Sequence, residues 1–123
     1  MKKLLLAAAA VLVAAPALAG TMDSTYGNTV TVTNSKGAQT TLLFEADGTY
    51  TAKGQNADGT DMMGGGKWEV KDGKYCSTPN AVEGQPAPVE SCTEYVDGKN
   101  VGDKWTQKDA NGEDITVEIS AGR

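Results

Sequence analysis

The side chains that could carry catalysis are few in this chain of 123 residues. It contains no histidine, two cysteines and 16 acidic residues. Nucleophilic catalysis needs a serine, threonine or cysteine beside a general base, and without histidine the familiar triads cannot be assembled. Ser77 and Ser91 lie beside the cysteines without a recognisable lysine-based motif. Paired carboxylates could hydrolyse glycosides, but most such enzymes are larger and have a deep cleft. We therefore expect no enzymatic activity, no catalytic residue and no cofactor.

Two short segments concentrate oxygen ligands around a glycine. Residues 56–61 are NADGTD and residues 109–114 are DANGED. An EF-hand loop has its glycine at the sixth position and an acid at the twelfth, whereas each of these segments has its glycine at the fourth. The same pattern is typical of hairpin turns in which Asp or Asn binds its own backbone. We interpret both segments as turns and predict no metal site.

Cys76 and Cys92 are the only cysteines and lie 16 positions apart. A metal site built on two thiolates would lack further ligands of the usual soft type, because the chain has no third cysteine and no histidine. In an exported chain, an even pair of cysteines predicts one disulfide.

The first twenty residues, MKKLLLAAAAVLVAAPALAG, have the three zones of a secretory signal peptide. Two lysines precede an apolar run, and Ala17-Leu18-Ala19 forms an A-x-A cleavage site. The apolar run has about twelve residues, whereas a membrane-spanning helix needs roughly 20. We predict that residues 1–19 are a signal peptide, that the mature chain begins at Gly20, and that it resides in the periplasm or outside the cell without stable membrane insertion.

The mature chain is acidic. Without Lys2 and Lys3, the 11 basic residues fall to nine against 16 acidic residues, and Arg123 is the only arginine. Nucleic-acid binding depends on basic side chains that neutralise phosphates, so we expect no nucleic-acid partner. The charges are dispersed singly, which favours solubility. The length suits one domain, which we expect to be monomeric.

Turn dipeptides recur along the chain, and runs rich in Thr, Val, Tyr and Trp lie between them. The runs predict strands at 28–34, 40–45, 49–54, 66–71, 74–78, 92–96, 103–108 and 114–120. We therefore predict an all-β fold: a small antiparallel meander of about eight strands that forms a barrel or sandwich with one disulfide. Residues 28–123 would form this single domain.

The turns also predict how neighbouring strands align. A three-residue turn around Asp47-Gly48 would place Phe44 opposite Tyr50 and Leu42 opposite Ala52. The same turn at Asp72-Gly73 would place Trp68 opposite Cys76.

Period-two alternation predicts which side chains point inward. Eleven residues are the predicted core: Val30, Val32, Leu42, Phe44, Tyr50, Trp68, Val70, Trp105, Ile115, Val117 and Ile119. An eight-stranded barrel is just wide enough to be filled by side chains or to hold one small ligand. Because this set is about what the domain needs for itself, we expect a filled interior.

Three irregular segments lie outside these strands. Residues 55–66, QNADGTDMMGGG, contain three adjacent glycines and predict a mobile loop. Residues 79–91 contain three of the four prolines, which cannot donate to a sheet ladder, and predict an exposed loop. Residues 20–27 predict a flexible N-terminal tail. The two loops supply the candidate binding residues, which are Asp58, Asp61, Met62, Met63, Pro79, Pro86 and Pro88.

The segments FEADGTYTAKG and GGGKWEVKDGKYC are followed by a second cysteine, GDKW and ITVEI. Over about residues 40–120, the chain resembles short exported Gram-negative proteins, mostly uncharacterised, in which F-x-x-D-G-T-Y precedes G-x-W-x-V-x-D-G-K-x-C. More distantly, it is similar to the periplasmic metalloprotease inhibitors, small eight-stranded barrels with one disulfide. That resemblance implies that residues 20–27 would enter a protease cleft, although GTMDSTYG contains no matching side-chain motif.

We therefore expect a secreted or periplasmic β domain that acts as a non-catalytic binding or envelope-associated module. Its partner would be a periplasmic protein that contacts the two candidate loops. The alternatives are a periplasmic protease inhibitor and a lipocalin-like barrel that binds a small ligand.

Overall fold

The computed structural model describes residues 20–55 and 59–123, which form eight antiparallel strands and one short helix. The predicted signal peptide and Asp58 lie outside the described residues. The elements are α2 (Thr21–Thr25), β2 (Thr29–Thr33), β3 (Gln39–Phe44), β4 (Thr49–Gln55), β5 (Asp61–Lys71), β6 (Lys74–Pro79), β7 (Ser91–Glu94), β8 (Lys104–Lys108) and β9 (Asp114–Ser120). The predicted all-β class is confirmed.

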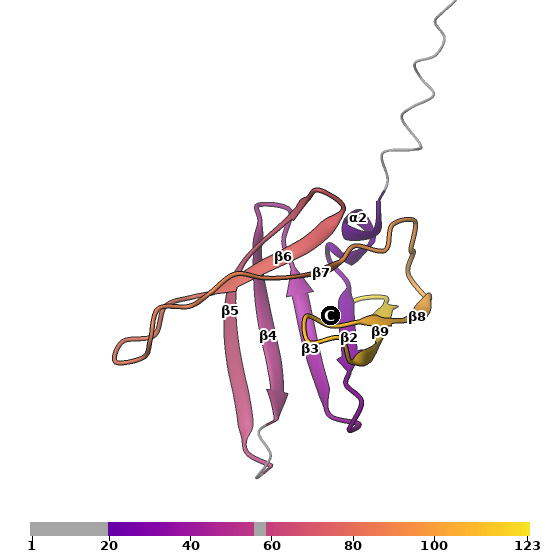
Figure 1. Ribbon diagram of the computed structural model, residues 1–123. Helices are drawn as coiled ribbons and strands as arrows, with labels where there is room; N and C mark the ends of the chain where they lie inside the picture. The colour runs from indigo at the N-terminus through magenta and orange to yellow at the C-terminus, as the bar shows by residue number, and fades with distance from the viewer. Residues whose placement is uncertain (1–19, 56–58) are drawn as a thin grey trace, which may run out of the picture.

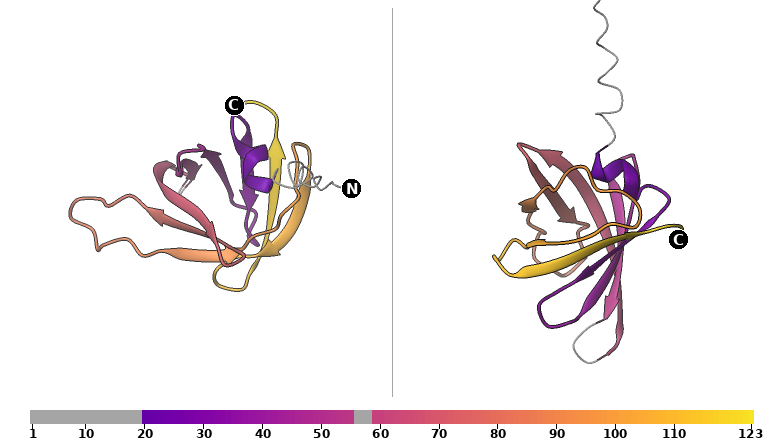
Figure 2. Two further views of the ribbon diagram at one scale, coloured as in Figure 1. Left: turned by 90° about the horizontal axis from the view of Figure 1, so that it is seen from above. Right: turned by 90° about the vertical axis from the view of Figure 1, so that its right-hand side faces the viewer.

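All eight strands belong to one sheet with the order β7-β6-β5-β4-β3-β2-β9-β8. Strands β2 to β7 form a meander, and the β8–β9 hairpin returns so that β9 pairs with β2. The sheet curls until its two edge strands, β7 and β8, approach each other (Figure 1, Figure 2). The result is a nearly closed barrel, which resolves the choice between barrel and sandwich that the sequence left open.

Strand β5 begins at Asp61, so the predicted mobile loop is wrong for residues 61–66. This segment pairs with β4 along its length, from Gln55 opposite Asp61 to Tyr50 opposite Gly66. A Cβ on Gly65 would lie 2.7 Å from the carbonyl oxygen of Tyr50, and one on Gly66 would clash with the carbonyl oxygen of Thr78. These glycines therefore permit close approach of neighbouring backbones rather than a flexible loop.

The register of the β3–β4 hairpin is confirmed, with Phe44 opposite Tyr50 and Leu42 opposite Ala52. The register predicted for the β5–β6 hairpin is wrong. Lys71 and Lys74 are partners, so Asp72 and Gly73 alone form the turn.

Both turn residues of the β5–β6 hairpin have positive φ, 52° for Asp72 and 75° for Gly73. Positive φ at both central positions is the hallmark of the tight type I′ hairpin turn, which suits the twist of antiparallel strands. Trp68 consequently lies opposite Ser77, and Glu69 lies opposite Cys76.

The predicted flexible tail is also wrong, because residues Thr21–Thr25 form α2. Thr21, Met22 and Thr25 are only 5%, 9% and 2% exposed. Figure 1 shows α2 at one end of the barrel. The segment is therefore part of the folded domain, and Met22 belongs to the hydrophobic core.

The core contains most of the predicted inward residues. Val30, Phe44, Val117 and Ile119 are buried together with Met22. Tyr26, Val32, Leu42, Tyr50, Trp68, Tyr75, Tyr95, Trp105 and Ile115 pack against them. Val70 is the exception among the eleven, since it is 38% exposed. It lies near the turn at the end of the β5–β6 hairpin, where the ladder ends at Lys71 and Lys74.

The disulfide between Cys76 and Cys92 is confirmed, and it joins directly opposite positions of β6 and β7. Cys76 is 1% exposed, so the bridge is well covered on that side. The chain between the two cysteines projects away from the barrel as a long arm (Figure 2). Among the described residues, no helix has the length and apolar character needed to cross a membrane.

Removing the disulfide should destabilise the domain strongly. A bridge that closes a loop of about 16 residues contributes on the order of 3 kcal/mol in the chain-entropy model. At about 4 °C or more per kcal/mol, the Cys76→Ser/Cys92→Ser variant should melt at least roughly 12 °C lower than the oxidised protein. Thermal unfolding followed by circular dichroism measures this difference in melting temperature. The native chain with its disulfide reduced provides a second comparison with the oxidised protein. An unchanged melting temperature would show that the bridge is not structural.

Candidate functional site

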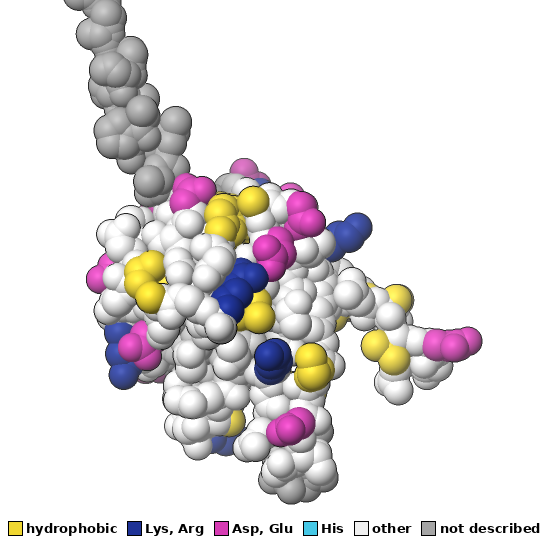
Figure 3. Space-filling model, turned by 180° about the vertical axis from the view of Figure 1, so that it is seen from behind, with side chains coloured by type: hydrophobic (Ala, Val, Ile, Leu, Met, Phe, Trp, Pro, Cys, Tyr) yellow, Lys and Arg dark blue, Asp and Glu magenta, His cyan; other side chains and the backbone are white. Residues whose placement is uncertain are grey.

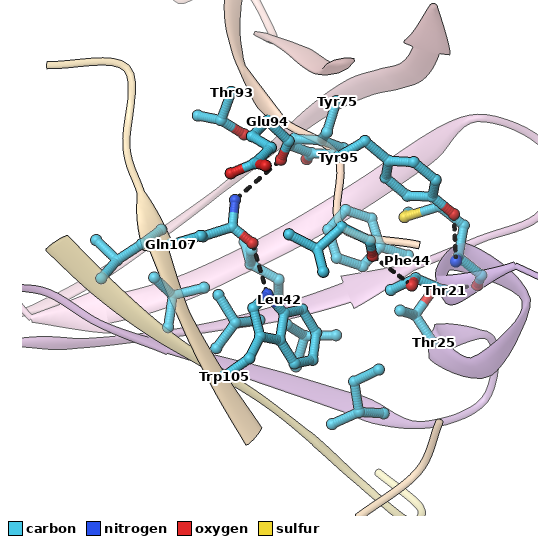
Figure 4. Close-up of a pocket in the computed structure, with 17 residues that line it drawn as sticks. Thr21, Thr25, Leu42, Phe44, Tyr75, Thr93, Glu94, Tyr95, Trp105 and Gln107 are labelled. Carbon is cyan, nitrogen blue, oxygen red and sulfur yellow. Dashed lines mark hydrogen bonds between the residues drawn. The ribbon is translucent and has the colours of Figure 1, made fainter. Parts of the chain in front are cut away.

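The barrel closes between β7 and β8, and no backbone ladder joins these two strands. One side chain connects them instead. Nε2 of Gln107, on β8, donates a hydrogen bond to the backbone carbonyl of Glu94, on β7, over 2.9 Å. Oε1 of Gln107 accepts a hydrogen bond from the indole Nε1 of Trp105 over 2.7 Å. Both ends of the amide are engaged, so Gln107 has a defined orientation in this seam (Figure 4).

Behind the seam lies a cavity of about 230 Å³. Its wall is formed by α2, by residues of β2, β3, β6, β8 and β9, and by β7 with the residues after it (Figure 4). The lining residues are Thr21, Met22, Thr25, Val30, Val32, Leu42, Phe44, Tyr75, Thr93, Glu94, Tyr95, Val96, Trp105, Gln107, Ile115, Val117 and Ile119. The expectation of a completely filled interior is therefore wrong.

The cavity exists because the barrel is incompletely closed. Strands β7 and β8 are short, with four and five residues, and each has a ladder partner on one side only. The curled sheet therefore leaves a wedge of space between its edges. The lining includes the small side chains Thr93, Val96 and Val117 beside its aromatic residues, and together they leave this space unfilled.

Polar groups in the wall are largely engaged with the protein itself. Thr25 Oγ1 donates to the carbonyl of Met22 over 2.6 Å, and Thr21 Oγ1 donates to the carbonyl of Val96 over 2.5 Å. The hydroxyl of Tyr95 accepts from the amide of Met22 over 3.2 Å. Because these groups are already paired, they offer little hydrogen bonding to a bound molecule.

Burial perturbs the pKa of two tyrosines of the wall. Burial raises the pKa of Tyr75, and this outweighs its hydrogen bond with Ser77, which lowers it. Burial also raises the pKa of Tyr95. A raised phenol pKa means that the charged phenolate is disfavoured, as expected for an apolar environment.

Helix α2 closes the barrel over the cavity and is attached to the chain that follows β7. The amide of Thr21 donates to Oδ1 of Asp97 over 3.2 Å, and the amide of Lys99 donates to Oγ1 of Thr21 over 3.0 Å. Together with the bonds of Thr21 and Met22 to Val96 and Tyr95, these contacts hold the helix in place. The first described residues of the chain therefore form part of the cavity wall.

None of the candidate binding residues that the structure describes lines this cavity. Asp61, Met62 and Met63 lie on β5, where Met62 is 46% exposed and Met63 is 70% exposed. Pro79 is the last residue of β6 rather than a loop residue. Pro86 and Pro88 lie in the irregular arm between β6 and β7, as predicted.

The arm carries exposed apolar and acidic side chains. Val82 and Val89 are exposed, and Figure 3 shows hydrophobic and acidic side chains on the projecting segment. Lys71 bridges to Glu90 over 3.0 Å at the base of the arm. The arm and the cavity are thus separate features.

The interpretation of residues 109–114 as a turn is confirmed. Oδ1 of Asp109 accepts hydrogen bonds from the amides of Asn111 and Glu113 over 2.8 and 2.9 Å. Elsewhere among the described residues, Cys76, Cys92 and Glu90 bring potential metal ligands together. Because the two sulfur atoms are bonded to each other, this group does not offer two thiolates to a metal.

Comparisons with known proteins add no functional information. No family model matches the chain, and no curated protein or solved structure is significantly similar to it. The case for a site therefore depends on the geometry of the cavity.

Gln107→Glu should open the seam selectively. The carboxylate can still accept from Trp105, but it replaces the Nε2 donor with an oxygen that faces the carbonyl of Glu94. Loss of one hydrogen bond and a new repulsive contact should lower the free energy of unfolding by about 1 to 3 kcal/mol at pH 7. Denaturant unfolding measures this, and hydrogen exchange should increase at β7 and β8.

Protonation of the new carboxyl group restores a donor, so the defect of Gln107→Glu should shrink below pH 4. Lys108→Glu is a suitable control, because Lys108 is exposed on the same strand and pairs with Asp114. Equal stability of Gln107→Glu and the native protein at pH 7 would show that Gln107 does not hold the seam.

Proposed function

We propose that the protein is an exported, non-catalytic binding module whose barrel holds one small apolar molecule. The observation that carries this proposal is the cavity of about 230 Å³ behind the β7–β8 seam, whose wall is almost entirely apolar. Ligand sites in proteins are typically concave, apolar and supplied with few polar groups. The location outside the cytoplasm is supported by the signal-like N-terminus and by the disulfide.

The size of the cavity limits the class of ligand. Apolar cavities of about 150 Å³ stay dry and bind benzene. A cavity of about 230 Å³ therefore suits a single substituted ring or a short branched alkyl chain rather than a long fatty acid. Phe44, Tyr75, Tyr95 and Trp105 provide aromatic surfaces in the wall, which favour a flat apolar ligand.

The composition of the wall supports binding rather than catalysis. Glu94 is the only acidic residue in the lining, and the lining contains no lysine, arginine or cysteine. The threonine hydroxyls of α2 donate to backbone carbonyls instead of facing a base. These side chains can exclude water and contact an apolar molecule, but they form no pair of nucleophile and base.

The seam offers one entrance to the cavity. A ligand that passes between β7 and β8 must displace one side-chain hydrogen bond, whereas passage between any other neighbouring strands breaks a backbone ladder. Movement of the Gln107 side chain would therefore admit a ligand at low energetic cost.

Toluene serves as a defined probe for the cavity. The native protein should bind one molecule with a dissociation constant of about 1 mM or tighter, as measured by isothermal titration calorimetry. Val117→Phe adds volume inside the wall, where Val117 is 8% exposed, and should weaken binding at least tenfold. Filling a real void should change the free energy of unfolding by less than about 2 kcal/mol.

Val101→Phe is the matched control, because Val101 is 44% exposed and lies outside the lining. It should bind toluene like the native protein. No binding to the native protein, or equal binding to Val117→Phe, would contradict the proposal. Native mass spectrometry of protein purified from its own compartment then identifies any retained ligand.

Export predicts a defined N-terminus for the mature protein. When the full chain is produced in a Gram-negative host, the periplasmic fraction should contain a protein that begins Gly20-Thr21-Met22. N-terminal sequencing of that fraction checks the prediction. Recovery of uncleaved chain in the cytoplasm alone would contradict it.

A further inference from the structure

The position of Gly20 carries an inference beyond ligand binding, and it rests on the proposed cleavage before this residue. We propose that the α-ammonium group created by cleavage at Gly20 is a structural cation that locks α2 over the cavity. The relevant surroundings are two carboxylates, Asp23 and Asp97, which both lie close to Gly20.

Gly20 makes close contacts with groups of α2 and of the chain after β7. Its backbone nitrogen donates to Oδ2 of Asp23 over 2.9 Å. A Cβ at Gly20 would lie 2.9 Å from both Oδ1 of Asp97 and the hydroxyl of Tyr95. The same Asp97 oxygen accepts from the amide of Thr21. The site therefore accommodates glycine and places a second carboxylate beside it.

The two carboxylates have no cation of their own among residues 20–55 and 59–123. The ion pairs described there involve Lys71, Lys108 and Arg123, and none includes Asp23 or Asp97. The nearest lysine in sequence to Asp97 is Lys99, whose ammonium lies over the Trp105 ring, 5.4 Å from its centroid. Strand β3, which also packs against α2, contains no charged residue.

Cleavage would supply the missing charge. Hydrolysis of the bond between residues 19 and 20 by a signal peptidase consumes one water, leaves a carboxylate on Ala19 and releases the amino group of Gly20, which is protonated at neutral pH. In the uncleaved chain, Gly20 offers one neutral N–H donor. In the mature chain it offers a charged group with three donors to Asp23 and the neighbouring carboxylate of Asp97.

The pH dependence follows from the sign of the charge. An α-amino group in an unfolded chain has a pKa of about 7.7 to 8.0, and two neighbouring carboxylates raise this pKa in the folded state. The stabilisation is therefore fully present below about pH 7.7 and is lost as the pH rises through the higher folded-state pKa. Tyr95 also lies beside Gly20, and burial raises the pKa of its phenol above the ordinary value.

The test compares a chain that begins at Gly20 with one that retains Ala19. The two have the same net charge, but in the longer chain the ammonium is displaced by one residue. At pH 6 the chain beginning at Gly20 should melt roughly 3 to 5 °C higher, and the amides of residues 21–25 should exchange more slowly. The difference should vanish at about pH 10.5. Asp97→Asn, introduced into both chains, should remove most of the difference at pH 6.

Equal melting temperatures at pH 6 would overturn the proposal. So would a difference that persists at pH 10.5 or in the Asp97→Asn pair, because it would show that Ala19 acts by its bulk alone. Toluene binding, measured on the chain beginning at Gly20, reports separately on the cavity. The two proposals are therefore tested independently. A negative result for the Gly20 ammonium does not affect the test of ligand binding, and a negative toluene experiment does not affect the test of the ammonium.

Discussion

The structure depends on a sheet that must close between two strands without a backbone ladder. In a fully closed barrel, every strand edge is paired and no edge is exposed. Here β7 and β8 face each other, and the amide of Gln107 provides the hydrogen bond that crosses between them. Trp105 orients that amide from the same strand. The strand order therefore brings the edge strands β7 and β8 together, and the side chains of Gln107 and Trp105 connect them in place of a backbone ladder.

This seam explains why strand β7 needs covalent support. Its only ladder partner is β6, and the disulfide joins the two strands at Cys76 and Cys92. Without that bridge, a four-residue strand with one neighbour would have little to hold it beside the cavity. The three parts of the closure have distinct roles: the disulfide fixes β7 to the sheet, Gln107 joins it to β8, and α2 covers the end of the barrel.

The cavity is the consequence of this closure and also the feature most suited to function. Protein interiors are usually packed as densely as organic crystals, so an unfilled apolar volume carries an energetic cost. A ligand of matching shape would remove part of that cost, and an apolar wall with paired polar groups selects such a ligand. The proposed ammonium of Gly20 acts at the same end, where α2 forms part of the wall. Ligand binding and chain maturation would thus stabilise one shared element.

The sequence by itself determined the strands, the β3–β4 register, the disulfide and most of the core, because alternation, Asp-Gly turns and paired cysteines act over short stretches of chain. It did not reveal the strand at residues 61–66, since a run of three glycines resembles a flexible loop until the backbones of Tyr50 and Thr78 lie against it. The helix at Thr21–Thr25 was missed for a similar reason, because its stability comes from contacts with residues 95–99. Only the tertiary structure decided that the barrel contains an open cavity, because such a volume depends on how distant strands curve and where the sheet closes.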